Sequence, residues 1–101
     1  MEQSLKGQVA VITGASGGLG AHFARVLAEA GAAVALTARR LDLVENHAGE
    51  IAGAGGTAMA LRLDVADAGS IGPALDEVET ALGPISILVN NAGVGGEGLA
   101  L

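Results

Sequence analysis

The chain has 101 residues, enough for one small domain, and its lack of cysteine excludes disulfides, thiolate metal sites and a cysteine nucleophile. Its 11 acidic and 5 basic residues give a formal net charge of −6, so no positive field favours nucleic-acid binding. Its apolar stretches are shorter than a membrane-spanning helix and its first residues do not resemble a signal peptide, so we expect a soluble, cytoplasmic protein.

The first third of the chain predicts a strand, a helix and a second strand. Residues 8–13 form a β-rich apolar run that begins after Gly7 and ends at Gly14, as is typical of a buried strand. After a glycine cluster, apolar residues recur at helical spacing until Gly31, where a C-cap glycine is expected. Residues 33–37 repeat the strand pattern. The apolar positions of this first helix are Leu19, Phe23, Val26, Leu27 and Ala30.

The rest of the chain predicts two more helices and two more strands. A second helix starts near Leu41 and ends in the glycine-rich segment 53–56, and residues 58–63 follow as a third strand. Ser70 is the expected N-cap of a third helix, which Gly83 and Pro84 end. Residues 85–90 form a nearly continuous apolar strand, of the kind covered on both faces in parallel sheets. The apolar faces of these helices are Leu41, Val44, Ala48 and Ile51, and Ile71, Leu75, Val78 and Leu82.

This alternation of strands and helices predicts an α/β fold with an open parallel sheet. Right-handed crossovers give the strand order 3-2-1-4, which is a Rossmann-type three-layer fold and the N-terminal half of a doubly wound domain. The strand at 85–90 would be an unpaired apolar edge if the sheet ended there, so we expect a further strand beside it. The tail at 93–101 has no period that predicts an element.

The segment TGASGGLG, residues 13–20, lies between the first predicted strand and helix. Gly14 permits a sharp turn, a central glycine lets backbone N–H groups approach a pyrophosphate, and Gly20 allows close packing of helix on strand. The helix N-terminus then offers unpaired donors and a partial positive charge to the phosphates. The competing interpretation is a tight turn without a ligand. The spacing does not fit GxGxxG, and the lysine of a P-loop is absent.

The loop resembles the TGxxxGxG motif of the short-chain dehydrogenase/reductase family, and Gly17 makes the extended branch's TGxxGxxG match equally well. The tetrapeptide NNAG at residues 90–93 follows the fourth predicted strand, as is typical of the short-chain branch. Asp64 and Val65 end the third strand, where members contact the adenine. Three motifs in the family's order therefore identify the chain as similar to the N-terminal, cofactor-binding part of a typical short-chain member.

The resemblance implies which residues contact the dinucleotide. Asp64 would accept from the adenine amino group, Asn90 and Gly93 would lie along the adenosine ribose, and Asn91 would pin the central sheet. The competing interpretation of Asp64 is a turn or helix-capping carboxylate. The cofactor-binding residues that we expect are Gly14, Ser16, Gly18, Leu19, Gly20, Arg39, Arg40, Asp64, Val65, Asn90, Ala92 and Gly93.

The end of the second strand predicts a preference for NADP(H), with NAD(H) as the second option. Folds that prefer NAD place an acid there, whereas this chain has Ala38 followed by Arg39 and Arg40. A guanidinium–phosphate hydrogen bond contributes about 1.5 to 3 kcal/mol, or roughly ten- to a hundredfold in affinity. We expect Arg39 to be the main contact, with Ser16 as a hydroxyl partner and Arg40 as the weaker candidate. Two solvated arginines are the alternative, and Gly17 stands where many NADP-preferring relatives carry a basic residue.

No catalytic residue is assigned in this chain. The family's Ser, Tyr and Lys set needs a tyrosine, which the chain lacks, and its single lysine, Lys6, precedes the first strand. We therefore expect residues 1–101 to be a Rossmann domain truncated before the catalytic segment and inactive alone. His22 and His47 are expected on the surface, without a metal site.

In full-length form, the resemblance implies an NADP(H)-dependent oxidoreductase that acts on a small carbonyl or alcohol. It also implies a homodimer or homotetramer, and neither nucleic acid nor a membrane is an expected partner. The alternatives are a non-catalytic dinucleotide-binding module or redox sensor, and a flavin- or adenosylmethionine-binding domain, which the glycine spacing and NNAG disfavour. A YxxxK motif downstream of this chain would support the interpretation as an enzyme over that as a non-catalytic module.

Overall fold

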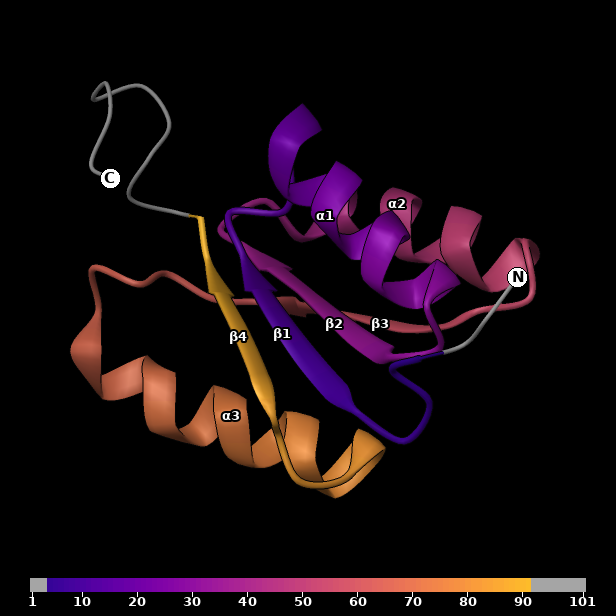
Figure 1. The fold of residues 1–101 in the computed structure, drawn as a ribbon. Coiled ribbons are helices and arrows are strands. Elements are labelled where there is room, and N and C mark those ends of the chain that lie inside the picture. The colour runs from indigo at the N-terminus through magenta and orange to yellow at the C-terminus, as the bar shows by residue number, and fades with distance from the viewer. Residues whose placement is uncertain (1–3, 92–101) are drawn as a thin grey trace.

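The computed structural model describes residues 4–91, which form a four-stranded parallel sheet with helices on both faces (Figure 1). The strand order is β3-β2-β1-β4 and every paired neighbour is parallel, which confirms the predicted fold class. The elements are β1 (Val9–Thr13), α1 (Gly18–Glu29), β2 (Ala33–Ala38), α2 (Leu41–Gly53), β3 (Thr57–Arg62), α3 (Ala68–Leu82) and β4 (Ile87–Asn90).

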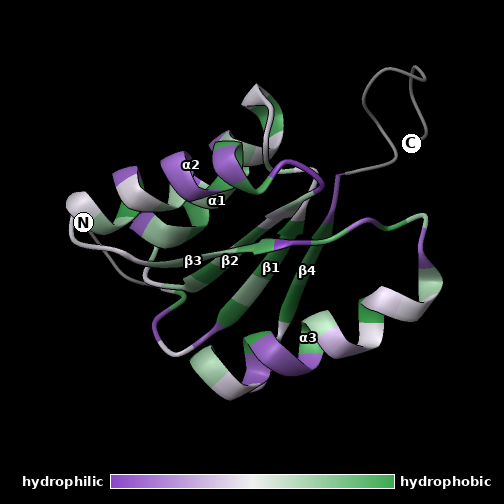
Figure 2. Ribbon diagram, turned by 180° about the vertical axis from the view of Figure 1, so that it is seen from behind, coloured by the Kyte–Doolittle hydropathy of each residue, from purple (hydrophilic) through white to green (hydrophobic). Residues whose placement is uncertain are grey.

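Side chains of the central strand β1 alternate between two buried clusters. Ala10 and Ile12 lie in the core beneath α1 and α2, whereas Val9 and Val11 lie with Val78 of α3 on the other face. Figure 2 shows the apolar strands between these helical layers, with hydrophilic segments on the outer sides of the helices. All of β1 is buried, as expected for a parallel strand covered on both faces.

Helix α1 buries only part of the predicted apolar stripe, in which Leu27 packs against the core. Leu19 is 53% exposed and Val26 is 47% exposed, so the prediction that these two residues belong to the buried face was wrong. The helix instead rests on small residues, because a surface without bulky side chains allows its backbone to lie close to the sheet. The buried residues of α1 are Gly20, Ala21, Ala24 and Ala28.

Helix α3 begins earlier than predicted. Its N-cap is Asp67 rather than Ser70, and the helix starts at Ala68. The Ser70 hydroxyl lies in the first turn and donates to the carbonyl oxygen of Asp67 at 2.9 Å and to that of Asp64 at 3.3 Å. A hydroxyl engaged with preceding carbonyl groups does not accept from helix N–H groups as a cap would, so the predicted capping role was wrong.

The starts and ends of β3 and β4 differ from the predictions by one or two residues. β4 begins at Ile87, because the Ile85 N–H is taken by Glu79 Oε2 at 2.9 Å in the turn after α3. β3 covers Thr57–Arg62 rather than 58–63. Gly31 and Gly83 follow α1 and α3 with φ of 105° and 108°, which confirms both predicted helix stops.

Strand β4 lies at the edge of the described sheet, where it pairs with β1. Its Leu88 stands opposite Val11 in the register and is 60% exposed. None of the helices within residues 4–91 is long and apolar enough to cross a membrane.

Candidate functional site

The predicted site residues gather along one edge of the sheet. Parallel strands end at the same edge, and the register pairs Thr13 with Asn90 and Ala38 with Arg62 at those ends. The segments that follow β1, β2 and β3 therefore begin at this edge, beside Asn90 and Asn91 at the end of β4. Ala92 and Gly93 lie outside the described residues.

The glycines of the loop after β1 have two different structural roles. Gly14 turns the chain with a φ of 64°. A Cβ on Gly20 would stand 2.5 Å from the Gly14 carbonyl oxygen and 2.8 Å from the Ala15 Cα, so packing requires glycine there. A Cβ on Gly17 or Gly18 would meet no atom of residues 4–91 within 4 Å. The fold itself therefore does not need these two glycines, and the space beside them is open.

The amino end of α1 is uncapped by side chains. Gly17 is the N-cap, it makes no side-chain cap hydrogen bond, and the first turn contains no acidic residue. The preceding loop is held in place by the Ala15 N–H, which donates to the Thr37 carbonyl oxygen at 3.0 Å. Unpaired N–H groups and the helix dipole make such an end suited to an anion.

A polar cluster joins the ends of β1 and β4 beside this loop. Thr13 Oγ1 donates to Asn90 Oδ1 at 3.1 Å and accepts from the Asn91 N–H at 2.9 Å. Asn91 Nδ2 donates to the Gly14 carbonyl oxygen at 3.1 Å, which confirms that Asn91 pins the central strands together. The sequence reasoning missed Thr13, although a polar residue at the end of an apolar strand was a visible signal.

Asp64 takes part in the turn after β3. Its Oδ1 accepts from the Ala66 N–H at 3.0 Å, and its carbonyl oxygen accepts from the Asp67 N–H at 2.9 Å. One carboxylate oxygen of Asp64, Oδ1, therefore stabilises a turn, which was the competing interpretation of this residue. Val65 beside it is 40% exposed. Contact of either residue with adenine stays a prediction.

The two arginines after β2 are both exposed but differ in their contacts. Arg40 forms a paired contact with Asp42, from Nε to Oδ1 at 3.2 Å and from Nη2 to Oδ2 at 3.0 Å. The hydrogen bond from Arg40 lowers the pKa of the Asp42 carboxyl, and the same bond raises the pKa of Arg40. No hydrogen bond or ion pair among residues 4–91 engages Arg39. Of these two arginines, Arg39 is therefore the one whose charge is available to a ligand.

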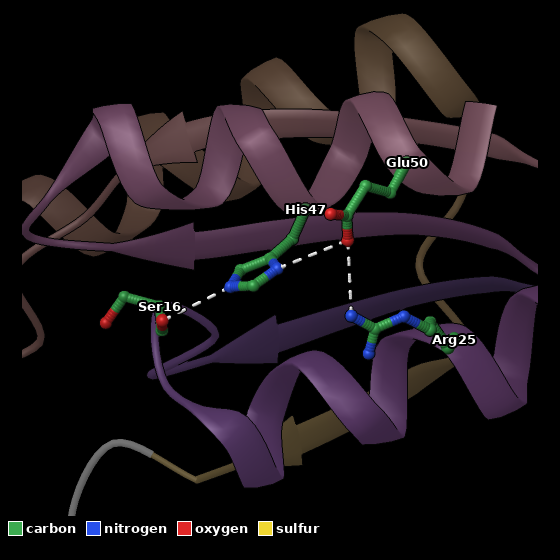
Figure 3. Close-up of polar contacts among 4 residues, drawn as sticks. All are labelled: Ser16, Arg25, His47 and Glu50. Atoms are coloured by element: carbon green, nitrogen blue, oxygen red, sulfur yellow. Dashed lines mark hydrogen bonds and ion pairs between the residues drawn. The ribbon is translucent and has the colours of Figure 1, made fainter. Parts of the chain in front are cut away.

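His47 is not the surface residue that the sequence predicted. Its side chain is 25% exposed, and Nε2 lies 3.3 Å from the Ser16 carbonyl oxygen in the glycine loop (Figure 3). Its position three residues after the buried Val44 and four before the buried Ile51 was the signal that places it near the core. His22 is exposed, as predicted.

A groove of about 290 Å³ lies between the carboxyl-terminal halves of α1 and α2, away from the edge of the sheet where the predicted site residues gather. Arg25, Glu29 and Glu50 line it together with Gly55 and Gly56, which precede β3. Because these residues lie toward the opposite end of the sheet from the glycine loop, the groove is separate from the site at the strand ends.

Comparisons with known proteins agree with this arrangement. The sequence model of the short chain dehydrogenase family matches residues 8–100. An uncharacterized oxidoreductase of Mycobacterium tuberculosis is 44% identical over 96 residues, which cover 92% of this chain and 28% of that protein.

Solved structures of short-chain dehydrogenases share the fold. A short-chain type dehydrogenase/reductase from Mycobacterium marinum superposes with a TM-score of 0.80 at 45% identity, over 84% of this chain and 34% of that one. A metagenomic short-chain oxidoreductase in complex with NADP superposes with a TM-score of 0.79 at 42% identity, over 84% of this chain and 38% of that one. The chain thus spans about a third of the relatives it matches, and it belongs to the short-chain dehydrogenase family.

Proposed function

We propose that residues 1–101 are the NAD(P)-binding domain of an NADP(H)-dependent oxidoreductase. The whole protein would move a hydride between NADP(H) and a small carbonyl or alcohol substrate. Membership of the short-chain dehydrogenase family supports the reaction class. The solved relative with bound NADP supports the cofactor, as does the unpaired Arg39 at the end of β2.

The observation that carries this proposal is the open amino end of α1 at the point where the strand order reverses. The chain runs from β1 to β2 on one side, whereas β4 lies on the other side of β1. Open α/β sheets bind their ligands outside the carboxyl ends of the strands at such a point. Gly17 and Gly18 leave this place free of side chains, so a diphosphate fits against the helix end.

The residues around this point fit the remaining parts of NADP(H). Arg39 would bind the 2′-phosphate, Ser16 would assist it, and Arg40 would contribute less because Asp42 already offsets its charge. Asp64 keeps one carboxylate oxygen for the adenine amino group, because Oδ1 alone is used by the turn. The nicotinamide supplies the hydride chemistry, and the residues of this chain bind and orient it. The other expected contacts are Gly14, Leu19, Gly20, Val65, Asn90, Ala92 and Gly93.

We further place the proton-transfer group of the whole protein outside this chain, because residues 1–101 contain no tyrosine. The exposed Leu88 on the edge strand β4 supports a further strand beside it in the whole protein. A cytoplasmic location stays a prediction from the sequence composition, and assembly into dimers or tetramers stays a prediction from the family resemblance.

A competition among nucleotides tests the proposal. The intact protein that carries this chain is titrated with NADPH, NADH, FAD and S-adenosylmethionine, and NADPH is expected to bind most tightly. Turnover of carbonyl compounds with NADPH then distinguishes an oxidoreductase from a non-catalytic binding module. Binding of FAD or S-adenosylmethionine without binding of either nicotinamide dinucleotide would refute the proposal.

A further inference from the structure

His47 contacts the glycine loop from the side of α2. Its ring lies between α2 and the loop, with Nε2 directed at the Ser16 carbonyl oxygen at 3.3 Å (Figure 3). A carbonyl oxygen can only accept a hydrogen bond, so Nε2 carries the proton and donates. The bond connects α2 to a loop that lies 31 residues earlier in the chain.

The other edge of the ring faces an ion pair between the two helices. Nδ1 lies 3.8 Å from Glu50 Oε1, and the same oxygen accepts from Arg25 Nη2 of α1 at 3.2 Å. Nδ1 is buried and has no hydrogen-bond partner within the described part of the chain. In the neutral ring Nδ1 carries no proton to share with Glu50, and a buried polar atom without a hydrogen-bond partner costs stability. The hydrogen bond from Nε2 to the glycine loop is then the polar contact that the histidine supplies.

The geometry of the peptide group links His47 to a backbone amide at the amino end of α1, that of the N-cap Gly17. The peptide bond between Ser16 and Gly17 is trans, so its C=O and N–H point in opposite directions. A carbonyl held toward α2 therefore turns the Gly17 N–H away from α2. No backbone hydrogen bond among residues 4–91 uses this N–H as a donor, so it is available to a ligand.

We propose that His47 is a positioning residue of the cofactor site, which fixes the direction in which the Gly17 N–H is presented to the diphosphate of NADP(H). This inference rests on the proposed function. The Ser16 side chain points away from His47, so the contact leaves its hydroxyl free for the ligand (Figure 3). Because His47 belongs to the helix that begins just after Arg39 and Arg40, it also ties the loop to the second binding element of the site.

Variants at position 47 separate the hydrogen bond from the packing of the ring. His47→Phe keeps a ring but removes the donor, whereas His47→Gln keeps a side-chain N–H donor. His22→Phe on α1 is the matched control, because His22 is exposed and none of the side-chain hydrogen bonds among residues 4–91 joins it to the loop. In the intact protein, His47→Phe is expected to weaken NADPH binding about two- to tenfold, the range for one neutral hydrogen bond. His47→Gln should restore most of the affinity, and His22→Phe should leave it unchanged.

An amide spectrum of the unliganded protein provides a readout that does not depend on the cofactor. His47→Phe should shift the Gly17 amide resonance, and His47→Gln should move it back toward its original position. Tight NADPH binding in wild type and equally tight binding in His47→Phe would overturn the positioning role, as would weak binding in both variants at position 47. A wild-type protein that binds no dinucleotide would overturn the proposed function instead, while the shift of the Gly17 amide would still report the contact.

Discussion

The side-chain amide of Asn91 donates a hydrogen bond of 3.1 Å to the backbone carbonyl of Gly14, across 77 positions of the sequence. This bond joins the end of β4 to the first residue of the glycine loop. The Asn91 backbone N–H also donates to Thr13 Oγ1 at 2.9 Å, so a single residue holds the loop by two bonds. Hydrogen bonds from the end of the neighbouring strand β4 therefore hold the loop in place before any ligand binds.

Removing this amide should loosen the loop and destabilise the fold. Asn91→Ala abolishes the bond to Gly14 but keeps the backbone bond to Thr13, so we expect a loss of about 0.5 to 1.5 kcal/mol in the free energy of unfolding. Urea denaturation of the intact protein measures this change. Thr80→Ala on α3 removes a hydrogen bond to the Asp76 carbonyl oxygen, which lies outside the proposed site, and serves as a comparison for NADPH affinity, which only Asn91→Ala should lower. Unchanged stability and affinity in Asn91→Ala would contradict the role of this bond.

Substitution of two loop glycines should have different effects, because the fold requires Gly20 whereas the proposed ligand requires Gly18. Gly20→Ala forces a Cβ against the Gly14 carbonyl oxygen, and such overpacking costs about 1 to 3 kcal/mol of stability. Gly18→Ala has open space and should leave stability unchanged or raise it, because alanine favours helix. It should nevertheless weaken NADPH binding, since its methyl group occupies the space proposed for the diphosphate. Urea denaturation and NADPH titration of both variants measure these effects, and a Gly18→Ala variant that binds NADPH normally would speak against that placement.

Arg39 and Arg40 form a matched pair for testing cofactor preference. Arg39→Ala should lower the NADPH-to-NADH affinity ratio roughly ten- to a hundredfold, the range of one charge-assisted bond. Arg40→Ala should change the ratio less, because Asp42 already engages that guanidinium. Titrations of both variants with both dinucleotides decide the matter. Equal effects of the two substitutions would show that the ion pair with Asp42 does not distinguish them.

The contact between Arg40 and Asp42 has a predictable dependence on pH. Arg40 lowers the pKa of the Asp42 carboxyl in the folded chain, so the pair stabilises the fold at and above the usual aspartate pKa. This contribution disappears as the pH falls through the lowered pKa, because the carboxyl then becomes protonated. Carbon NMR of the Asp42 carboxyl should show the lowered pKa, and Arg40→Ala should move it back upward. Identical titration curves in wild type and Arg40→Ala would contradict the pairing.

The architecture was predictable because its signals are local and periodic. The apolar run that ends at Gly14 identified β1. Gly31 and Gly83 marked the ends of two helices, and both glycines adopt positive φ in the structure. Alternation of strands with helices then permitted few topologies, because parallel crossovers are nearly always right-handed. The strand order 3-2-1-4 was the simplest arrangement that these constraints allow.

The details that the sequence did not reveal depend on contacts between distant segments. Periodicity identified α1 but favoured its large apolar residues, whereas close packing against the sheet selects small ones such as Ala24. Ser70 resembles a cap in the sequence, but its hydroxyl is drawn to the carbonyl oxygens of Asp64 and Asp67. The contact of His47 with Ser16 could be found only once α2 was placed beside the loop.

The central claim is that backbone amides at the amino end of α1 bind the diphosphate of a dinucleotide. Amide NMR of the isotope-labelled intact protein during titration with NADPH tests this claim most directly. We expect the largest shifts at the amides of residues 17–20, with smaller shifts at Arg39 and Asp64. Saturable binding that shifts other amides and leaves residues 17–20 unchanged would contradict it.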